Sequence, residues 1–219
     1  MIRLVPTPAQ RRLIMLALAS GVWLVSFAEL ARMGTWTTFA VGGAVLALAA
    51  LVFGAVPAAL LRPSAGKVAA GLVAGVLMAV LTHLAYAVVA PLVPEVRAAT
   101  SRLLGLLNVG GFSPGARALL IVVIATSEEV LFRGALGGDA TPGIRGLQRG
   151  DLLAVAALAA VYALATVTLG SPLLMACALG CGIAWGVLRV VAGSLVVPIV
   201  AHVVWDLGVL VVWPLASSG

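Results

Sequence analysis

Long apolar runs follow one another along this chain of 219 residues. Seven runs can be delimited, at roughly 13–33, 36–61, 68–92, 116–137, 151–170, 172–190 and 194–214. An α-helix needs about 20 apolar residues to cross a bilayer, whereas barrel strands alternate in character over about ten residues. The runs therefore predict an all-α, polytopic transmembrane bundle of about seven spans, forming a single integral membrane domain over residues 1–219.

The composition excludes an ordinary soluble domain. Hydrophobic residues make up 63% of the chain and charged residues only 9%, against about 25% charged residues in soluble proteins. The net charge of +6 comes from residues at the ends of the apolar runs. Such a charge reports orientation in a membrane, so we expect contact with a lipid bilayer and no nucleic-acid partner.

The distribution of Lys and Arg between the runs predicts a cytoplasmic amino terminus, because cytoplasmic loops carry the excess of basic residues. One side would hold eight of them, namely Arg3, Arg11, Arg12, Arg62, Lys67, Arg145, Arg149 and Arg189. The other would hold four, namely Arg32, Arg97, Arg102 and Arg117. One span more or fewer would reverse the side on which the carboxyl terminus lies, so that side stays open.

Residues 95–107 separate two of the runs and show a helical pattern of their own. Apolar residues recur at helical spacing, while Arg97, Ser101 and Asn108 share the other side. This pattern indicates a short helix lying in the membrane interface. A plain connector is the alternative, and the pattern alone does not separate the two.

The run over 116–137 contains Glu128, Glu129 and Arg133 within six residues. Each ionisable side chain near the centre of a bilayer costs about 2.5–3.5 kcal/mol on insertion scales. Such groups normally face a protein interior or a water-filled cavity and mark a functional site. We therefore expect the working centre of the molecule at this position.

A second ionisable pair lies in the last run. Glu129 and Arg133 share one helix face at i,i+4, as do His202 and Asp206, while Glu128 is turned about 100° from Glu129 and has no partner on its own helix. Both groups fall about eight residues into their spans, at similar depth. The pattern predicts one site built from all five residues. A polar network that only holds helices together is the alternative.

Two motifs resemble those of the intramembrane endopeptidases called CPBP, for CAAX protease and bacteriocin processing, or Abi. The stretch Glu128–Gly134 matches the EExxxR motif, and the stretch Gly193–Asp206 matches the HxxxN or HxxxD motif with its Gly-Ser-Leu and Pro lead-in. The resemblance covers about residues 115–210. It implies the CAAX-protease fold, a hydrolase that cleaves a peptide or membrane-protein substrate, and a multi-pass protein of a bacterial cytoplasmic membrane.

The resemblance also implies roles for individual residues. Glu128 would activate water, Glu129 and Arg133 would support it, and His202 with Asp206 would stabilise the oxyanion or orient the groups that do. A middle motif, FxxxH, falls here on Tyr162 to Thr166, so threonine stands where the family has its histidine. Threonine can hold a water molecule but cannot accept or supply a proton at neutral pH.

Other functions stay open at the level of sequence. A catalytically impaired relative could act as a membrane binding, immunity or assembly partner, and a small transporter could couple protons through Glu128 and His202.

No cofactor is expected, although zinc held by Glu128, His202 and Asp206 is an alternative for a hydrolase. His83, the other histidine, is a further candidate that a packed, hydrogen-bonded role would explain equally well.

Overall fold

The computed structural model describes residues 35–53, 55–107, 111–137, 148–167 and 170–215, with residues 7, 10, 13–15, 17, 18, 21 and 22. Over these ranges every regular element is helical. In chain order they are α2 (Thr35–Val52), η1 (Ala58–Leu61), α3 (Ala65–Leu92), α4 (Pro94–Leu107), α5 (Pro114–Glu128), η2 (Glu129–Leu136), α6 (Arg149–Ala165), α7 (Pro172–Ala192), α8 (Val196–Leu207) and η4 (Gly208–Val212). η1 is a 3₁₀ helix, and η2 and η4 are π-helices.

Capping residues in the sequence mark the ends of several helices. Ser64, Ser113 and Ser171 each precede a helix and accept a backbone N–H from its first turn, which satisfies a donor that the helix itself leaves free. α7 ends at Ala192 and is followed by Gly193, whose φ of 57° lies in the left-handed region that favours glycine. The turn after Gly193 is fixed because the Leu195 N–H donates to the Leu60 carbonyl at 2.9 Å.

The seven predicted spans are only partly recovered. α3 and α7 are long and apolar enough to cross a membrane, while the apolar helices Trp36–Val52 and Val196–Val212 are shorter. The run predicted over 36–61 was too long, since α2 ends at Val52 and Pro57, which has no N–H to donate, precedes η1. Most of the run over 13–33 lies outside the described residues.

The surface of α3 is apolar along most of its length. Only 6% of its most apolar window is buried inside the protein. The exposed side chains include Leu72, Val73, Val76, Leu77, Val80, Leu81, Leu84 and Val88. An exposed apolar surface of this kind marks a contact with a membrane or a partner, which agrees with the lipid contact predicted from the composition.

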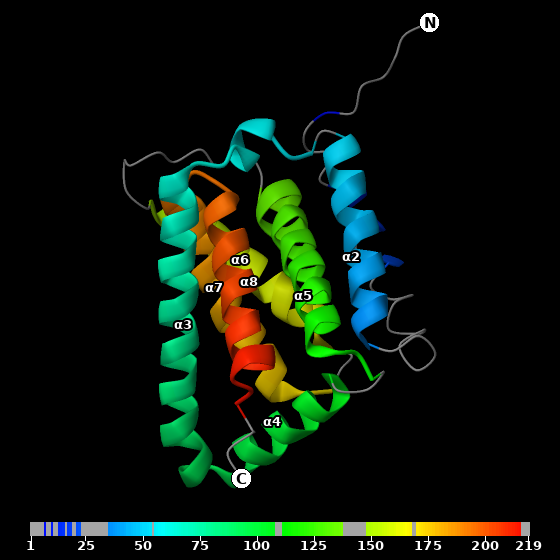
Figure 1. Ribbon diagram of the computed structural model, residues 1–219. Coiled ribbons are helices and arrows are strands. Elements are labelled where there is room, and N and C mark those ends of the chain that lie inside the picture. The colour runs from blue at the N-terminus through cyan, green and yellow to red at the C-terminus, as the bar shows by residue number, and fades with distance from the viewer. Residues whose placement is uncertain are drawn as a thin grey trace, which may run out of the picture.

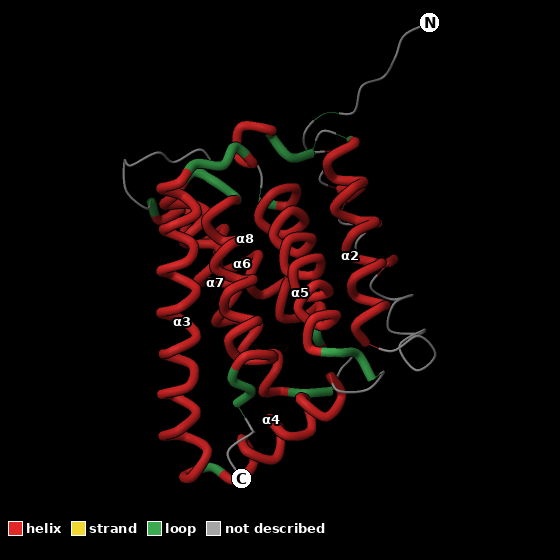
Figure 2. Tube along the Cα trace, viewed as in Figure 1, coloured by secondary structure: helices red, strands yellow, loops and turns green. Residues whose placement is uncertain are grey.

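The helices form a bundle in which α3, α8, α5 and α2 follow one another across the view of Figure 1. α3 packs along α8, α6 packs along α7, and α2 packs along α5. α4 crosses the lower end of the bundle, steeply inclined to the other helices (Figures 1 and 2). The prediction of a helix over 95–107 is therefore confirmed, while its position in a membrane interface stays a prediction.

Glycines allow two of these helix pairs to approach closely. A Cβ at Gly75 would lie 2.6 Å from the carbonyl oxygen of Ala201, so α3 and α8 meet at backbone distance there. On α7, Gly182 and Gly186 face α6: a Cβ at Gly182 would lie 3.0 Å from Ala159, and a Cβ at Gly186 would lie 2.7 Å from Val155. Small residues at such spacing are typical of close helix pairs in membranes.

Gly75→Ala is expected to lower the free energy of unfolding by about 1–3 kcal/mol, because the added methyl group meets backbone that must move. Thermal unfolding of the detergent-solubilised protein measures the effect. Gly66→Ala is the matched control in the same helix, since nothing lies within 4 Å of a Cβ at that position and alanine is the better helix former. Equal melting temperatures for the two variants would contradict the packing described here.

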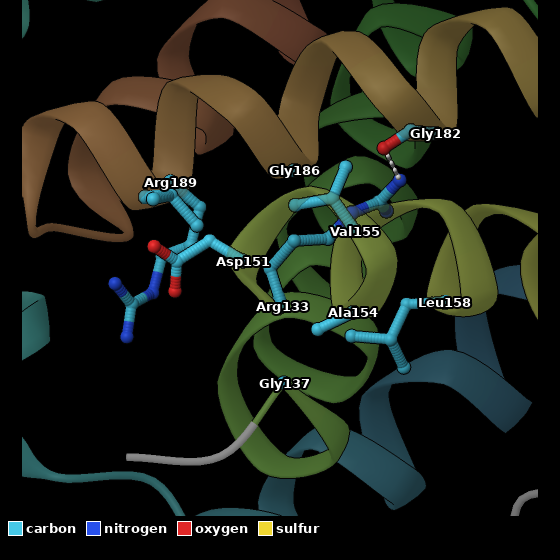
Figure 3. Close-up of a pocket in the computed structure, with 10 residues that line it drawn as sticks. Arg133, Gly137, Asp151, Ala154, Val155, Leu158, Gly182, Gly186 and Arg189 are labelled. Carbon is cyan, nitrogen blue, oxygen red and sulfur yellow. Dashed lines mark hydrogen bonds between the residues drawn. The ribbon is translucent and has the colours of Figure 1, made fainter. Parts of the chain in front are cut away.

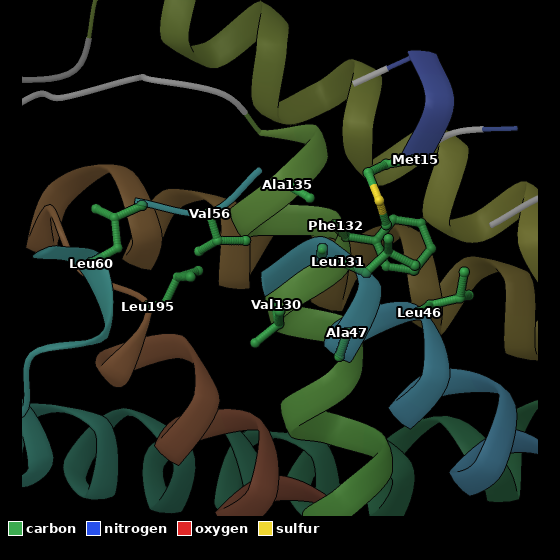
Figure 4. Packing of buried hydrophobic residues seen from close by; sticks show 11 residues of the cluster. Met15, Leu46, Ala47, Val56, Leu60, Val130, Leu131, Phe132, Ala135 and Leu195 are labelled. Carbon is green, nitrogen blue, oxygen red and sulfur yellow. The ribbon is translucent and has the colours of Figure 1, made fainter. Parts of the chain in front are cut away.

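The chain segment that carries the first motif is deeply buried in the bundle. All residues from Glu129 to Ala135 of η2 are buried. Its apolar side chains pack into a cluster with residues of α2, η1 and the α7–α8 turn (Figure 4). The cluster comprises Met15, Leu46, Ala47, Ala50, Val56, Leu60, Val130, Leu131, Phe132, Ala135 and Leu195. Close packing on this side fixes the direction in which Glu129 and Arg133 point.

Candidate functional site

Glu129 is at the centre of a buried ionic cluster. Its side chain has no exposed surface, and its Oε1 accepts a hydrogen bond from Arg133 Nη1 at 3.0 Å. Nδ1 of His202 lies 3.0 Å from the same oxygen. Within the described residues its second oxygen, Oε2, has no hydrogen-bond partner. The predicted i,i+4 pair is therefore present, and it is joined by a histidine from α8.

Arg133 connects this cluster to two further helices. Its Nη2 donates to the carbonyl oxygen of Gly182 in α7 at 3.2 Å, the bond drawn in Figure 3. Its guanidinium carbon lies 4.8 Å from the centre of the Tyr162 ring in α6. A guanidinium at that distance is attracted to an aromatic face. Arg133 thus holds η2, α6 and α7 in one arrangement while it neutralises Glu129.

Glu128 occupies a different environment from its neighbour. Its Oε2 accepts a hydrogen bond from the hydroxyl of Tyr162 at 2.6 Å. The same oxygen lies 3.9 Å from Nε2 of His202, and the side chain remains 12% exposed. The sequence left Glu128 without a partner on its own helix, and the structure supplies one from α6.

His202 is fixed from several directions. Its ring stacks on that of Trp185, with centroids 5.1 Å apart and planes inclined by 22°. Because a carboxylate offers only acceptors, Nδ1 donates to Glu129. Nε2 then faces the outer carboxylates and lies 3.5 Å from Asp206, whose side chain is 15% exposed. The predicted pair of His202 and Asp206 is thus also present.

Both functional helices change their winding beside the cluster. α5 gives way to the π-helix η2 at Glu129, and α8 gives way to η4 at Gly208, two residues after Asp206. The N–H of Glu129 is shared between the carbonyls of Ala125 and Thr126. π-helical turns are rare and often occur at functional sites. In this protein they lie beside the two predicted motifs.

The five ionisable residues that the sequence singled out therefore meet in one place. The two i,i+4 pairs are joined by contacts between segments far apart in the chain, because η2 brings Glu129 and α8 brings His202. Thr166, by contrast, directs its hydroxyl to the carbonyl of Ala163, 2.8 Å away within its own helix. That bond ties up the hydroxyl as a donor at the end of α6.

His83 lies elsewhere. Its Nε2 is 2.8 Å from the carbonyl of Trp213, and its ring stacks on the Trp213 indole with centroids 4.4 Å apart. It lines a cavity of about 440 Å³ beside α4, together with Arg97 and Ser101. The packed, hydrogen-bonded interpretation accounts for this histidine.

No set of three or more His, Cys, Asp or Glu side chains has a metal-binding arrangement in the part of the chain that the structure describes. Glu128 and Asp206 both lie near Nε2 of His202, at 3.9 and 3.5 Å. Nδ1 of the same ring is already bonded to Glu129. The polar contacts of the site are thus arranged around the imidazole ring.

A small cavity of about 40 Å³ lies behind Arg133, between η2, α6 and α7 (Figure 3). Its wall is mainly apolar and includes Val155, Leu158 and Gly186, with Asp151 and Arg189 at one side. Arg133 is among the residues that line the cavity.

Two contributors to the site were not recognised from the sequence. Trp185, which has no exposed surface, forms the platform under His202, and the Gly182 carbonyl accepts from Arg133. Both lie in α7, where Trp185 falls between Gly182 and Gly186. A large ring beside two glycines that bring helices together was the available signal, since such a ring must pack against a neighbouring helix.

Residues 112–208 match the family model described as type II CAAX prenyl endopeptidase Rce1-like. Over this range, a little under half of the chain, the sequence is similar to the Rce1-like family. The resemblance found in the two motifs is thereby confirmed, and all five ionisable residues of the cluster fall within the Rce1-like region. Rce1-like proteins are membrane-embedded proteases. No curated protein and no solved structure matches the chain.

Proposed function

We propose that this protein is an intramembrane endopeptidase that hydrolyses peptide bonds with a glutamate-activated water. One observation carries the proposal: two partly exposed carboxylates, Glu128 and Asp206, converge on Nε2 of the buried His202. Glu129 is fully buried and bonded to Arg133 and His202. Two adjacent glutamates in such different surroundings are suited to different tasks.

Glu128 is the general base of the proposed reaction, because it is the glutamate that water can reach. Tyr162 engages its Oε2, which leaves Oε1 to take a proton from water. The hydroxide oxygen then attacks the carbonyl carbon of the peptide bond. The proton passes from Glu128 to the leaving nitrogen as the C–N bond breaks, so that Glu128 ends as the carboxylate.

His202 stabilises the negative charge that forms on the carbonyl oxygen. The doubly protonated ring donates from both nitrogens, and Nε2 is the nitrogen aimed at Glu128 and Asp206. Donors fixed in advance stabilise such a charge strongly. Asp206 orients the ring from the outer side, and Glu129 with Arg133 holds it from the inner side.

The substrate class is a peptide or a membrane-associated protein, and the protein works as one multi-pass domain with its amino terminus in the cytoplasm. The exposed apolar surface of α3 supports a lipid environment. The excess of Lys and Arg on the predicted cytoplasmic side supports the orientation.

A cleavage screen by mass spectrometry tests this function. The purified protein is reconstituted in vesicles and presented with a diverse peptide library, with protein-free vesicles as the control. Cuts that require the protein support peptide hydrolysis. If the wild type cleaves no peptide and Thr166→His does, the chain has the fold of a protease but lacks one group that catalysis needs. Its function is then a binding, immunity or assembly role.

Cleavage is expected to persist unchanged in the presence of a strong chelator, since the proposed roles of Glu128 and His202 require no metal. The measurement is the rate of peptide cleavage before and after dialysis against EDTA. Recovery of a lost activity by zinc would instead assign Glu128, His202 and Asp206 as ligands of a catalytic metal.

A further inference from the structure

Tyr162 in α6 and Thr166, which directly follows the last residue of α6, lie one turn apart and make different contacts. The Tyr162 hydroxyl donates to Glu128 Oε2 at 2.6 Å. The Thr166 hydroxyl donates to the Ala163 carbonyl at 2.8 Å. Position 166 is where the motif comparison expects a histidine beside the catalytic glutamate. The polar group that α6 presents to Glu128 therefore comes from the preceding turn.

The Tyr162 hydroxyl is held by its ring as well as by its hydrogen bond. The ring packs edge-on against Phe132 with centroids 5.0 Å apart. Its face lies 4.8 Å from the guanidinium carbon of Arg133. Both neighbours belong to η2, the same element that begins directly after Glu128. The Tyr162 hydroxyl and the Glu128 carboxylate are thus held in a fixed relative position, because the Tyr162 ring packs on the element that follows Glu128.

We infer that Tyr162 is the positioning residue for Glu128 in peptide hydrolysis and takes the place of the missing histidine at position 166. This inference rests on the proposed function. The hydroxyl engages Oε2 and so turns Oε1 toward the water that Glu128 deprotonates. A tyrosine hydroxyl donates one hydrogen bond and is a poor proton acceptor at neutral pH, so Glu128 alone carries the proton in each direction.

Tyr162→Phe removes only the hydroxyl and keeps the ring contacts with Arg133 and Phe132. We expect kcat to fall about 10- to 100-fold, the effect of losing one hydrogen bond to a charged group, with KM unchanged. Tyr86→Phe is the matched control, because Tyr86 is the other tyrosine of the chain and lines the cavity that contains His83. It is expected to cleave as the wild type does.

Rescue by a second change separates positioning from a purely structural effect. In Tyr162→Phe/Thr166→His, the histidine lies on the same face of α6 one turn later, where it can bind Glu128 or its water. We expect the double variant to recover at least tenfold in kcat over Tyr162→Phe. An infrared band assigned to the Glu128 carboxylate by its loss in Glu128→Gln is expected to shift in Tyr162→Phe and not in Tyr86→Phe.

The outcomes distinguish this inference from the function on which it rests. If the wild type cuts and Tyr162→Phe cuts equally fast, or if the carboxylate band does not move, the role of Tyr162 is refuted and the protease stands. If the wild type does not cut while Thr166→His does, both are wrong, because Tyr162 has then not replaced the histidine.

Discussion

Glu128→Gln is expected to lower kcat for peptide cleavage by about 10²–10⁴-fold, the usual contribution of a general base. Glutamine keeps the size of the side chain and its carbonyl can still accept the bond from Tyr162. It cannot take a proton from water. The helix contacts should therefore survive while the chemical step is lost. Single-turnover cleavage of a peptide identified in the screen measures the change without interference from product release.

Glu95→Gln is the matched control for this substitution. Glu95 is exposed in the first turn of α4, and its change removes one carboxylate from the chain without touching the cluster. We expect its cleavage rate to equal that of the wild type. Cleavage by Glu128→Gln at the wild-type rate would refute the assignment of the base, and with it the glutamate-activated mechanism.

The sequence was most informative about contacts within one helix. Glu129 with Arg133 and His202 with Asp206 were predicted from their i,i+4 spacing, and each pair is present. Such contacts follow from helix geometry alone. That the two pairs would meet was a weaker prediction, based on similar depth in the membrane. It holds because α5 and α8 pack side by side.

Contacts between helices that no motif connects were beyond the reach of the sequence. The hydrogen bond from Tyr162 to Glu128 depends on how α6 is turned against η2, and the stack of Trp185 on His202 depends on α7. Apolar runs indicate the length of each helix and its orientation in the membrane. They do not indicate how the helix is rotated about its own axis against its neighbours. The same limit explains why the run over 36–61 did not show where α2 ends, since apolar residues continue past Val52.

Arg133→Ala is expected to lower the free energy of unfolding by about 3–5 kcal/mol, because it leaves Glu129 charged and buried without its main partner. Arg133 also donates to Gly182 and lies over Tyr162, so the loss reaches α6 and α7. For a chain of this size the melting temperature should fall by roughly 6–20 °C. Thermal unfolding in detergent measures the fall.

Two comparisons show whether charge or packing is responsible. Arg97→Ala removes an exposed arginine from α4 and is expected to leave the melting temperature within about 2 °C, since exposed charges contribute little. Glu129→Gln/Arg133→Met removes both charges and keeps the volume near Gly182, so it should recover much of the loss. If the double variant melts as low as Arg133→Ala, packing rather than the unpaired carboxylate sets the cost. Recovery of stability together with cleavage would assign Glu129 and Arg133 a structural role alone. Recovery of stability without cleavage would show that the two charges also act on the reaction, through the His202 ring that Glu129 holds.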